Sequence, residues 1–230
     1  MTPASAWRLC ALAGLATLAA STAFGRIPGL APCGPSDGAG AILALELARA
    51  PETVAALFGS EPCTARLLAA QRSALWLDML GFIPAYAAFL ALAGWALRGA
   101  GRRLALAAAA AVLIAGLCDE VEGVTMFAVM DPLPGTAWLF APLFWAVRVK
   151  FALLGVGEVL LAMLLFRTAR LGPIAAVPIA AGGLVSIWFL FAAPHEPLMM
   201  KAHSYAWAAL LVVAVIGAIR PALVSREIQV

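Results

Sequence analysis

Six long apolar stretches, joined by short polar links and one longer loop, set the pattern of the chain. Crossing about 30 Å of hydrocarbon takes about 20 helical residues, and each stretch approaches or exceeds that length. Alanine, leucine and valine dominate all six, without the roughly 10-residue alternation of an outer-membrane β-barrel. Since only helices and closed barrels satisfy the backbone in lipid, the pattern predicts an all-α, polytopic transmembrane helical bundle. The predicted spans cover residues 7–24, 74–97, 104–127, 144–166, 173–193 and 204–219.

These spans divide the chain into three parts. Residues 1–24 form a first transmembrane helix or signal anchor, residues 25–73 an extracytoplasmic loop with short amphipathic helices, and residues 74–230 a five-helix bundle. The first part also has the order of a secretory signal, with Arg8 before an apolar run that small residues follow. We favour a retained helix and six spans. Cleavage there would leave five spans without moving any later loop to the other side of the membrane.

The composition excludes several classes of soluble protein. The 230-residue chain is 64% hydrophobic and 12% charged, with a mean hydropathy of +1.00. Soluble domains usually carry about 25% charged residues, so most of this protein's surface is not exposed to water. A soluble enzyme and a nucleic-acid-binding protein are therefore excluded. The net charge of +3 reflects the basic loops of a membrane protein.

The basic residues fall on one side of the predicted membrane. They cluster in the links after the second, fourth and sixth spans, whereas the other links are mixed or acidic. Because cytoplasmic loops carry an excess of lysine and arginine, we expect both termini in the cytoplasm and the long first loop outside it. The membrane is then a bacterial-type cytoplasmic (inner) membrane. The residues that set this orientation are Arg98, Arg102, Arg103, Arg167, Arg170, Arg220 and Arg226.

The long first loop is predicted to carry structure of its own. Residues 41–49 are apolar enough for a helical turn or two, and Pro51, followed by an acid, is typical of a helix start. These short helices would pack over the bundle, either as a simple cap, which we favour, or as a lid. Cys33 and Cys63 both lie in this loop, and disulfides persist on the oxidising side of a membrane. We therefore predict a structural disulfide between them.

Several ionisable residues lie inside or at the ends of the predicted spans, where they are costly and often functional. The helical rise places Asp119 and Lys150 about 24–26 Å above the cytoplasmic boundary and Glu158 about 14 Å above it, near the midplane. Asp119 and Glu122 are three positions apart and share a helix face. Arg148 and Lys150 do not share a face, so only one of them is expected to meet the acids. The full set is Asp78, Asp119, Glu120, Glu122, Arg148, Lys150 and Glu158.

Most of these residues predict one polar site that opens toward the outside. The candidate catalytic residues are Glu158, Asp119 and Glu122, and the candidates for binding a substrate are Arg148, Lys150 and Asp78. A structural alternative is that the same charges only hold helices together, since such contacts contribute about 0.6–2 kcal/mol each in membranes. The depth of Glu158 favours function, because its side chain is too deep to reach the interface.

Small residues near this site predict close approach between helices. Gly155 and Gly157 lie just before Glu158 and would admit either another helix or a ligand. Gly182 and Ser186 have the small-xxx-small spacing of tightly packed membrane helices. We therefore expect the fifth span to pack closely on a neighbour.

Both histidines of the chain lie near the last predicted outer loop. With Met199 and Met200, His195 and His203 offer imidazoles and thioethers, which are copper ligands. The spacing matches no metal motif, and Pro197 interrupts any regular face. We therefore expect a loop that leads into the sixth span, with no metal and no cofactor.

Three functions are compatible with this pattern. A polar site confined to the outer half favours a pocket that binds or modifies a lipid-like or amphipathic molecule, with membrane lipids as partners. A small proton-coupled transporter with Glu158 as its proton site is the second, but the fifth and sixth spans offer no ionisable group to continue a path inward. The third is a structural or assembly subunit of a membrane complex. The sequence leaves the oligomeric state open.

Overall fold

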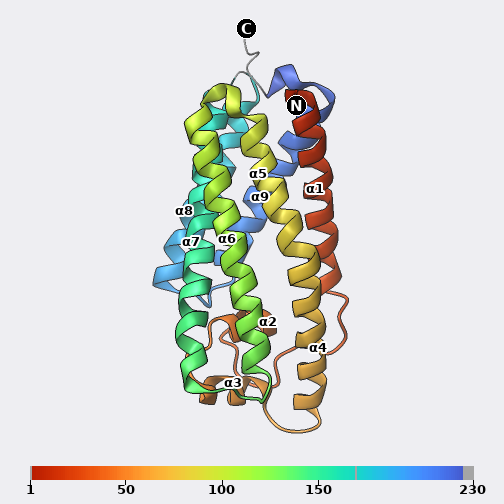
Figure 1. Ribbon diagram of the computed structural model, residues 1–230, viewed down its shortest axis with the longest axis vertical. Helices are drawn as coiled ribbons and strands as arrows, with labels where there is room; N and C mark the ends of the chain where they lie inside the picture. Colours follow the sequence, from red (N-terminus) through yellow and green to blue (C-terminus); the bar gives the residue numbers. More distant parts are fainter. Residues whose placement is uncertain (1, 169, 225–230) are drawn as a thin grey trace.

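Helices make up all of the regular structure in residues 2–168 and 170–224, the residues that the computed structural model describes (Figure 1). Six helical segments within this part are long and apolar enough to cross a membrane, which confirms the predicted all-α, multi-pass membrane protein. The segments are α1 (Pro3–Phe24), α4 (Cys63–Leu77) continued through the π-helical turn η1 (Asp78–Phe82) into α5 (Ile83–Ala96), α6 (Arg102–Val129), α7 (Phe140–Phe166) preceded by η3 (Ala137–Leu139), α8 (Gly172–Ala192) and α9 (Leu198–Ile219).

The six spans pack in a closed ring. Each contacts the next in the order α1, α5, α6, α7, α8 and α9, and α9 in turn contacts α1. Both described ends of the chain lie at the same end of the bundle, which we name the terminal end (Figure 1). The opposite end, which carries the disulfide, is the disulfide end. The ring arrangement directs side chains from all six spans toward a shared interior.

Glycines bring α7, α8 and α9 into close contact. A Cβ on Gly155 of α7 would lie 2.8 Å from the carbonyl oxygen of Gly183 on α8. A Cβ on Gly182 would lie 2.6 Å from the carbonyl oxygen of Ala202 on α9. The fifth predicted span, α8, therefore packs closely on both neighbours. The glycine near Glu158 admits a helix rather than a ligand.

Each of the six described spans begins before the predicted position, and the difference affects the site in two of them. The second begins at Cys63, well before its apolar run, because its first turns carry polar residues such as Gln71 that lower hydropathy without opposing a helix. The last begins at Leu198, with Pro197 at the N-cap position. The interpretation of residues 194–203 as a loop is therefore wrong from Leu198 onward. Proline near a helix start is well tolerated, and here it marks the beginning of α9 rather than an interruption.

At the disulfide end, α4, α6 and α7 extend beyond α1, α8 and α9, and two short helices pack there (Figure 1). They are α2 (Gly40–Glu46) and α3 (Pro51–Phe58), and α2 contacts the three longer spans α4, α6 and α7. The larger apolar side chains that α2, α3 and the residue after α2 bury are Leu43, Leu45, Leu47, Val54, Leu57 and Phe58. The loop thus contains the short amphipathic helices expected of it, and α2 covers one end of the bundle.

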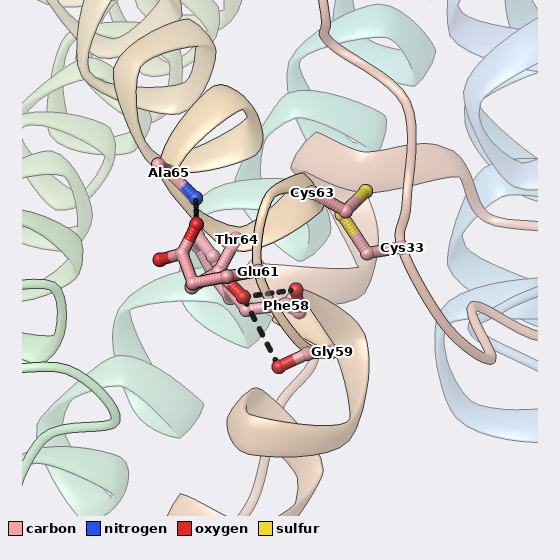
Figure 2. Close-up of a disulfide and its surroundings, with 7 residues drawn as sticks. All are labelled: Cys33, Phe58, Gly59, Glu61, Cys63, Thr64 and Ala65. Atoms are coloured by element: carbon pink, nitrogen blue, oxygen red, sulfur yellow. Dashed lines mark hydrogen bonds between the residues drawn. A yellow bond between two sulfur atoms is a disulfide. The ribbon is translucent and has the colours of Figure 1, made fainter.

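The predicted disulfide between Cys33 and Cys63 is present, with the two Cα atoms 5.9 Å apart (Figure 2). It joins the segment before α2 to the first residue of α4. Next to it, the Thr64 hydroxyl donates to the carbonyl oxygens of Phe58 and Gly59, each at 3.1 Å (Figure 2). These bonds and the disulfide fasten the loop to the start of the second span.

The links that carry the basic residues lie at the terminal end. They contain η2 (Arg98–Ala100), turn or bend residues at 167–168 and 170–171, and η4 (Pro221–Leu223). Arg226, which also entered the orientation argument, lies outside the described residues. The expected orientation follows from this charge asymmetry and stays a prediction.

Candidate functional site

Lys150 on α7 is the centre of a buried cluster of charges. Its ammonium nitrogen lies 3.1 Å from Glu46 Oε2, 3.0 Å from Asp119 Oδ1 and 2.7 Å from Glu122 Oε2. All four side chains are more than nine-tenths buried. An ammonium has three N–H donors, and the three carboxylates use all of them. The Lys150 cluster, as we name these four residues, joins α2 to α6 and α7.

Tyr86 connects the Lys150 cluster to α5. Its hydroxyl donates to Asp119 Oδ2 at 2.7 Å, so Asp119 uses one oxygen for Tyr86 and the other for Lys150. Asp78 is the first residue of the π-helical turn η1, which precedes α5. Its backbone carbonyl oxygen accepts a hydrogen bond from the N–H of Ile83. The Asp78 carboxylate is half-buried and has no hydrogen bond or ion pair with any described residue. It is therefore an unused acceptor beside a saturated cluster.

A second polar group lies around Glu158, deeper in the bundle. Glu158 Oε1 accepts hydrogen bonds from His203 Nδ1 at 2.7 Å and from Trp207 Nε1 at 2.6 Å. His203 and Trp207 are four positions apart on α9, so they share the face that meets α7. The imidazole also stacks on the ring of Phe151, with the ring centroids 5.8 Å apart. The carboxylate thereby fixes the orientation of a buried imidazole.

Both polar groups border one cavity of about 770 Å³. Lys150 and Asp119 line it near α2, and His203 and Trp207 line it further along the bundle. Glu122 and Glu158 do not line it; they support it from behind through the residues that they contact. The remaining polar lining comes from Glu46, Gln71, Asp78 and Tyr86, and from the hydroxyl residues Thr17, Ser21 and Ser204 on α1 and α9. Much of the apolar lining comes from Leu18, Phe24, Phe82, Phe89, Leu154, Leu211 and Val212.

The cavity opens on the side surface of the bundle between α1 and α9. Two of its lining residues there, Leu18 on α1 and Val212 on α9, are 50% and 59% exposed. On α9 the lining positions run from Met200 to Val212, about 18 Å along the helix. Both spans are long and apolar enough to cross a membrane, so this part of the opening lies on a surface that would face lipid.

Three of the six predicted site residues, Asp78, Asp119 and Lys150, line this cavity, and Glu122 and Glu158 lie behind its lining. Asp119, Glu122 and Lys150 lie together, and Asp78 lines the wall near them. Glu158 lies apart from this group, because eight residues of helix separate it from Lys150 by about 12 Å. It reaches the same cavity through His203 and Trp207 instead.

Arg148 lies away from the cavity. Arg148 and Lys150 are two positions apart, which rotates one side chain by about 200° around the helix axis relative to the other. Arg148 therefore points to nearly the opposite side of α7 from Lys150. Its guanidinium carbon lies 3.9 Å from the ring centroid of Phe144, and that of Arg49 lies 4.0 Å from the same ring. Loss of hydration and then the positive charge of Arg148 lower the pKa of Arg49. Lys150 is therefore the cation that meets the acids.

The sequence reasoning missed Glu46 and His203. Glu46 is the one acid among the apolar residues 41–49, and a charge on an otherwise apolar short helix is a signal for a buried partner. His203 is four residues before Trp207, but this spacing has meaning only once α9 begins at Leu198. Of the methionines considered with the histidines, Met199 is fully buried and Met200 lines the cavity.

Comparison of the chain with protein-family models, curated proteins and solved structures finds no match. What is established is a multi-pass helical membrane protein with buried charged residues. The cavity and its two polar groups are the features from which a more specific function can be inferred.

Proposed function

We propose that the protein binds a lipid-like or amphipathic molecule in this cavity, with its polar head near the Lys150 cluster and its apolar chain toward the gap between α1 and α9. The observation that carries the proposal is the order of the lining. Charged and amide groups lie under α2, and aromatic rings follow. The lining formed by the described residues of α1 and α9 has no ionisable side chain other than the His203 imidazole, and there aliphatic residues such as Leu18 and Val212 alternate with a few hydroxyl residues. A volume of about 770 Å³ is within the common range of ligand pockets, about 300–1,000 Å³.

The lateral opening supports access from the membrane. A molecule that is already in the bilayer can enter between α1 and α9 with its apolar part in lipid throughout. The basic terminal end favours a cytoplasmic location for that end. We therefore propose that the disulfide end faces the extracytoplasmic side of a bacterial-type inner membrane, and that the ligand comes from that leaflet.

The polar groups also suggest how a bound molecule would be modified. A carboxylate that holds Nδ1 of an imidazole fixes the tautomer and leaves Nε2 as the group for proton transfer, a common arrangement for a general base. Among the candidate catalytic residues, Asp119 lines the cavity, whereas Glu122 and Glu158 act as positioning residues for Lys150 and His203.

A structural role is the second candidate, and one observation favours it. The Lys150 ammonium has no free N–H donor, so the Lys150 cluster is complete without a ligand. This role explains why α2, α6 and α7 stay together, but it requires neither a cavity nor a lateral opening.

Two variants in which tryptophan replaces an exposed alanine test ligand binding. Ala208 lines the opening and is exposed, whereas Ala16 is exposed on α1 but does not line the cavity. The purified protein is extracted with organic solvent, and co-purified amphiphiles are quantified by mass spectrometry. We expect a bound molecule in wild type and in Ala16→Trp, and at least a tenfold loss in Ala208→Trp at an unchanged melting temperature. Equal retention by both variants, or no bound molecule in wild type, would contradict the proposal.

A further inference from the structure

The polar end of the cavity has more acidic than basic groups. Lys150 is the only lysine or arginine in the lining formed by the described residues. Around it are four carboxylates, those of Glu46, Asp78, Asp119 and Glu122. With all of them ionised, the one ammonium leaves three negative charges without a counter-charge. Negative charge in a water-poor site is costly unless a cation or protons compensate it.

Lys150 is not able to receive an anionic headgroup. Its three N–H donors already point to Glu46, Asp119 and Glu122. A phosphate or carboxylate would have to displace one of these buried acids and would then face the others as like charges. The cluster therefore disfavours acidic amphiphiles, although it contains a lysine.

Two acceptors in the lining have no donor. Gln71 is completely buried, and its Nε2 donates to the carbonyl oxygen of Ala41 at 2.7 Å, which leaves its Oε1 without a partner. The Asp78 carboxylate has no hydrogen bond or ion pair in the described part of the chain. The two residues are seven positions apart, two helical turns, so they share one face. A ligand with N–H groups would satisfy both, whereas a ligand with acceptors only would satisfy neither.

Aromatic rings line the cavity next to these acceptors. The ring of Tyr86 lies 5.4 Å from that of Phe82 and 5.2 Å from that of Trp207, measured between centroids. Phe82 and Trp207 are 6.0 Å apart, so the three rings form one continuous surface. Ring faces attract cations, most strongly in tryptophan. This surface is compatible with an ammonium group and gives no stabilisation to an anion.

We infer that the ligand of this cavity is a cationic amphiphile whose headgroup is a protonated amine, with Asp78 as its counter-ion and Gln71 Oε1 as a second acceptor. This inference rests on the proposed function and specifies its ligand class. The apolar chain extends past Tyr86 and Trp207 toward the opening between α1 and α9.

Four probes with the same chain test the headgroup preference. They are hexadecylamine, hexadecyltrimethylammonium, hexadecanol and hexadecanoate, each added to the protein in phosphatidylcholine nanodiscs. Affinity is obtained from the concentration dependence of the melting temperature, since a ligand of the folded state stabilises it by mass action. We expect hexadecylamine to bind at least tenfold more tightly than hexadecanol and hexadecanoate. The quaternary probe should be intermediate, because it has the charge but no N–H donor.

Asp78→Asn identifies the counter-ion, and Asp131→Asn is its matched control, because Asp131 is exposed in the link between α6 and α7. Asp78→Asn should weaken hexadecylamine binding about tenfold and leave hexadecanol unchanged, whereas Asp131→Asn should change neither. If Asp78→Asn does not fold, the ranking of the four probes on wild type still decides the headgroup preference.

The failures of the two proposals are distinguishable. Binding of hexadecanol or hexadecanoate as tight as that of the amine, lost in Ala208→Trp, would overturn the amine preference and leave the amphiphile pocket standing. Equal amine affinity in wild type and Asp78→Asn would overturn Asp78 as counter-ion. If Ala208→Trp affects the binding of none of the four probes, the pocket and the amine preference both fail.

Discussion

Lys150 is a single ammonium that three carboxylates surround away from bulk water. Pairs of this kind contribute little net stability, because forming them requires both charges to lose hydration. Removing one partner is a different matter, because it leaves the remaining charges buried without compensation. The Lys150 cluster therefore acts as a unit in which the lysine has the least replaceable role.

The variant Lys150→Met tests this at the residue scale. It keeps an unbranched side chain but removes the only cation from Glu46, Asp119 and Glu122, so we expect the free energy of unfolding to fall by about 3–5 kcal/mol. Denaturant unfolding in mixed micelles measures the change. Lys201→Met, at an exposed position, is the control and should stay within about 0.5 kcal/mol of wild type. A Lys150→Met protein as stable as this control would show that the acids are neutralised by protons instead.

Single residues were predictable where one helix determines their relation. The three-residue spacing of Asp119 and Glu122 places both on one face, and both contact Lys150. The contribution of Glu46 was not predictable, because no sequence pattern indicates that α2 packs against α7. The separation of Glu158 was accessible from helical rise, but its partner His203 depended on where α9 begins.

At the scale of elements, the lengths of the apolar stretches predict the six membrane spans. They do not predict the polar turns with which some of these helices begin. The second span begins with polar turns that extend beyond the apolar run, and these turns carry Gln71, which reaches the cavity. Hydropathy measures transfer into lipid, so it does not detect a helix that continues beyond the hydrocarbon. The short helices α2 and α3 were recognisable because residues 41–49 are apolar and because Pro51, followed by an acid, marks the start of α3.

The disulfide has a measurable effect on the loop and on α4. Closing the 30-residue separation between Cys33 and Cys63 stabilises the fold by about 3–4 kcal/mol in the chain-entropy model. Cys33→Ser should lower the free energy of unfolding by that amount and make it insensitive to reductant. Cys118→Ser, which changes a free and partly exposed cysteine, should behave as wild type and respond to reductant. Loss of reductant sensitivity in Cys118→Ser would contradict the assigned pairing.

At the scale of the whole molecule, the ring of spans and the clustering of arginines at the terminal end define an orientation that labelling can test. Arg102 and Glu52 are exposed at opposite ends of the bundle. In a chain that carries Cys118→Ala, we expect Glu52→Cys to react with a membrane-impermeant thiol reagent in intact cells and Arg102→Cys to react only after permeabilisation. Gel shift measures the labelling, and the reverse pattern would invert the proposed topology.

The two sides of the lateral opening, α1 and α9, are neighbours in the ring, although they are the first and the last of the six described spans along the chain. At a synthesis rate of about 5–20 residues per second, roughly 10–35 s pass between the end of α1 and the start of α9. Without α9 the ring of described spans is open between α1 and α8, along the length that Leu198–Ile219 covers. The wall that α9 contributes to the cavity, which includes His203 and Trp207, is therefore the last of its walls to be synthesised among the described spans.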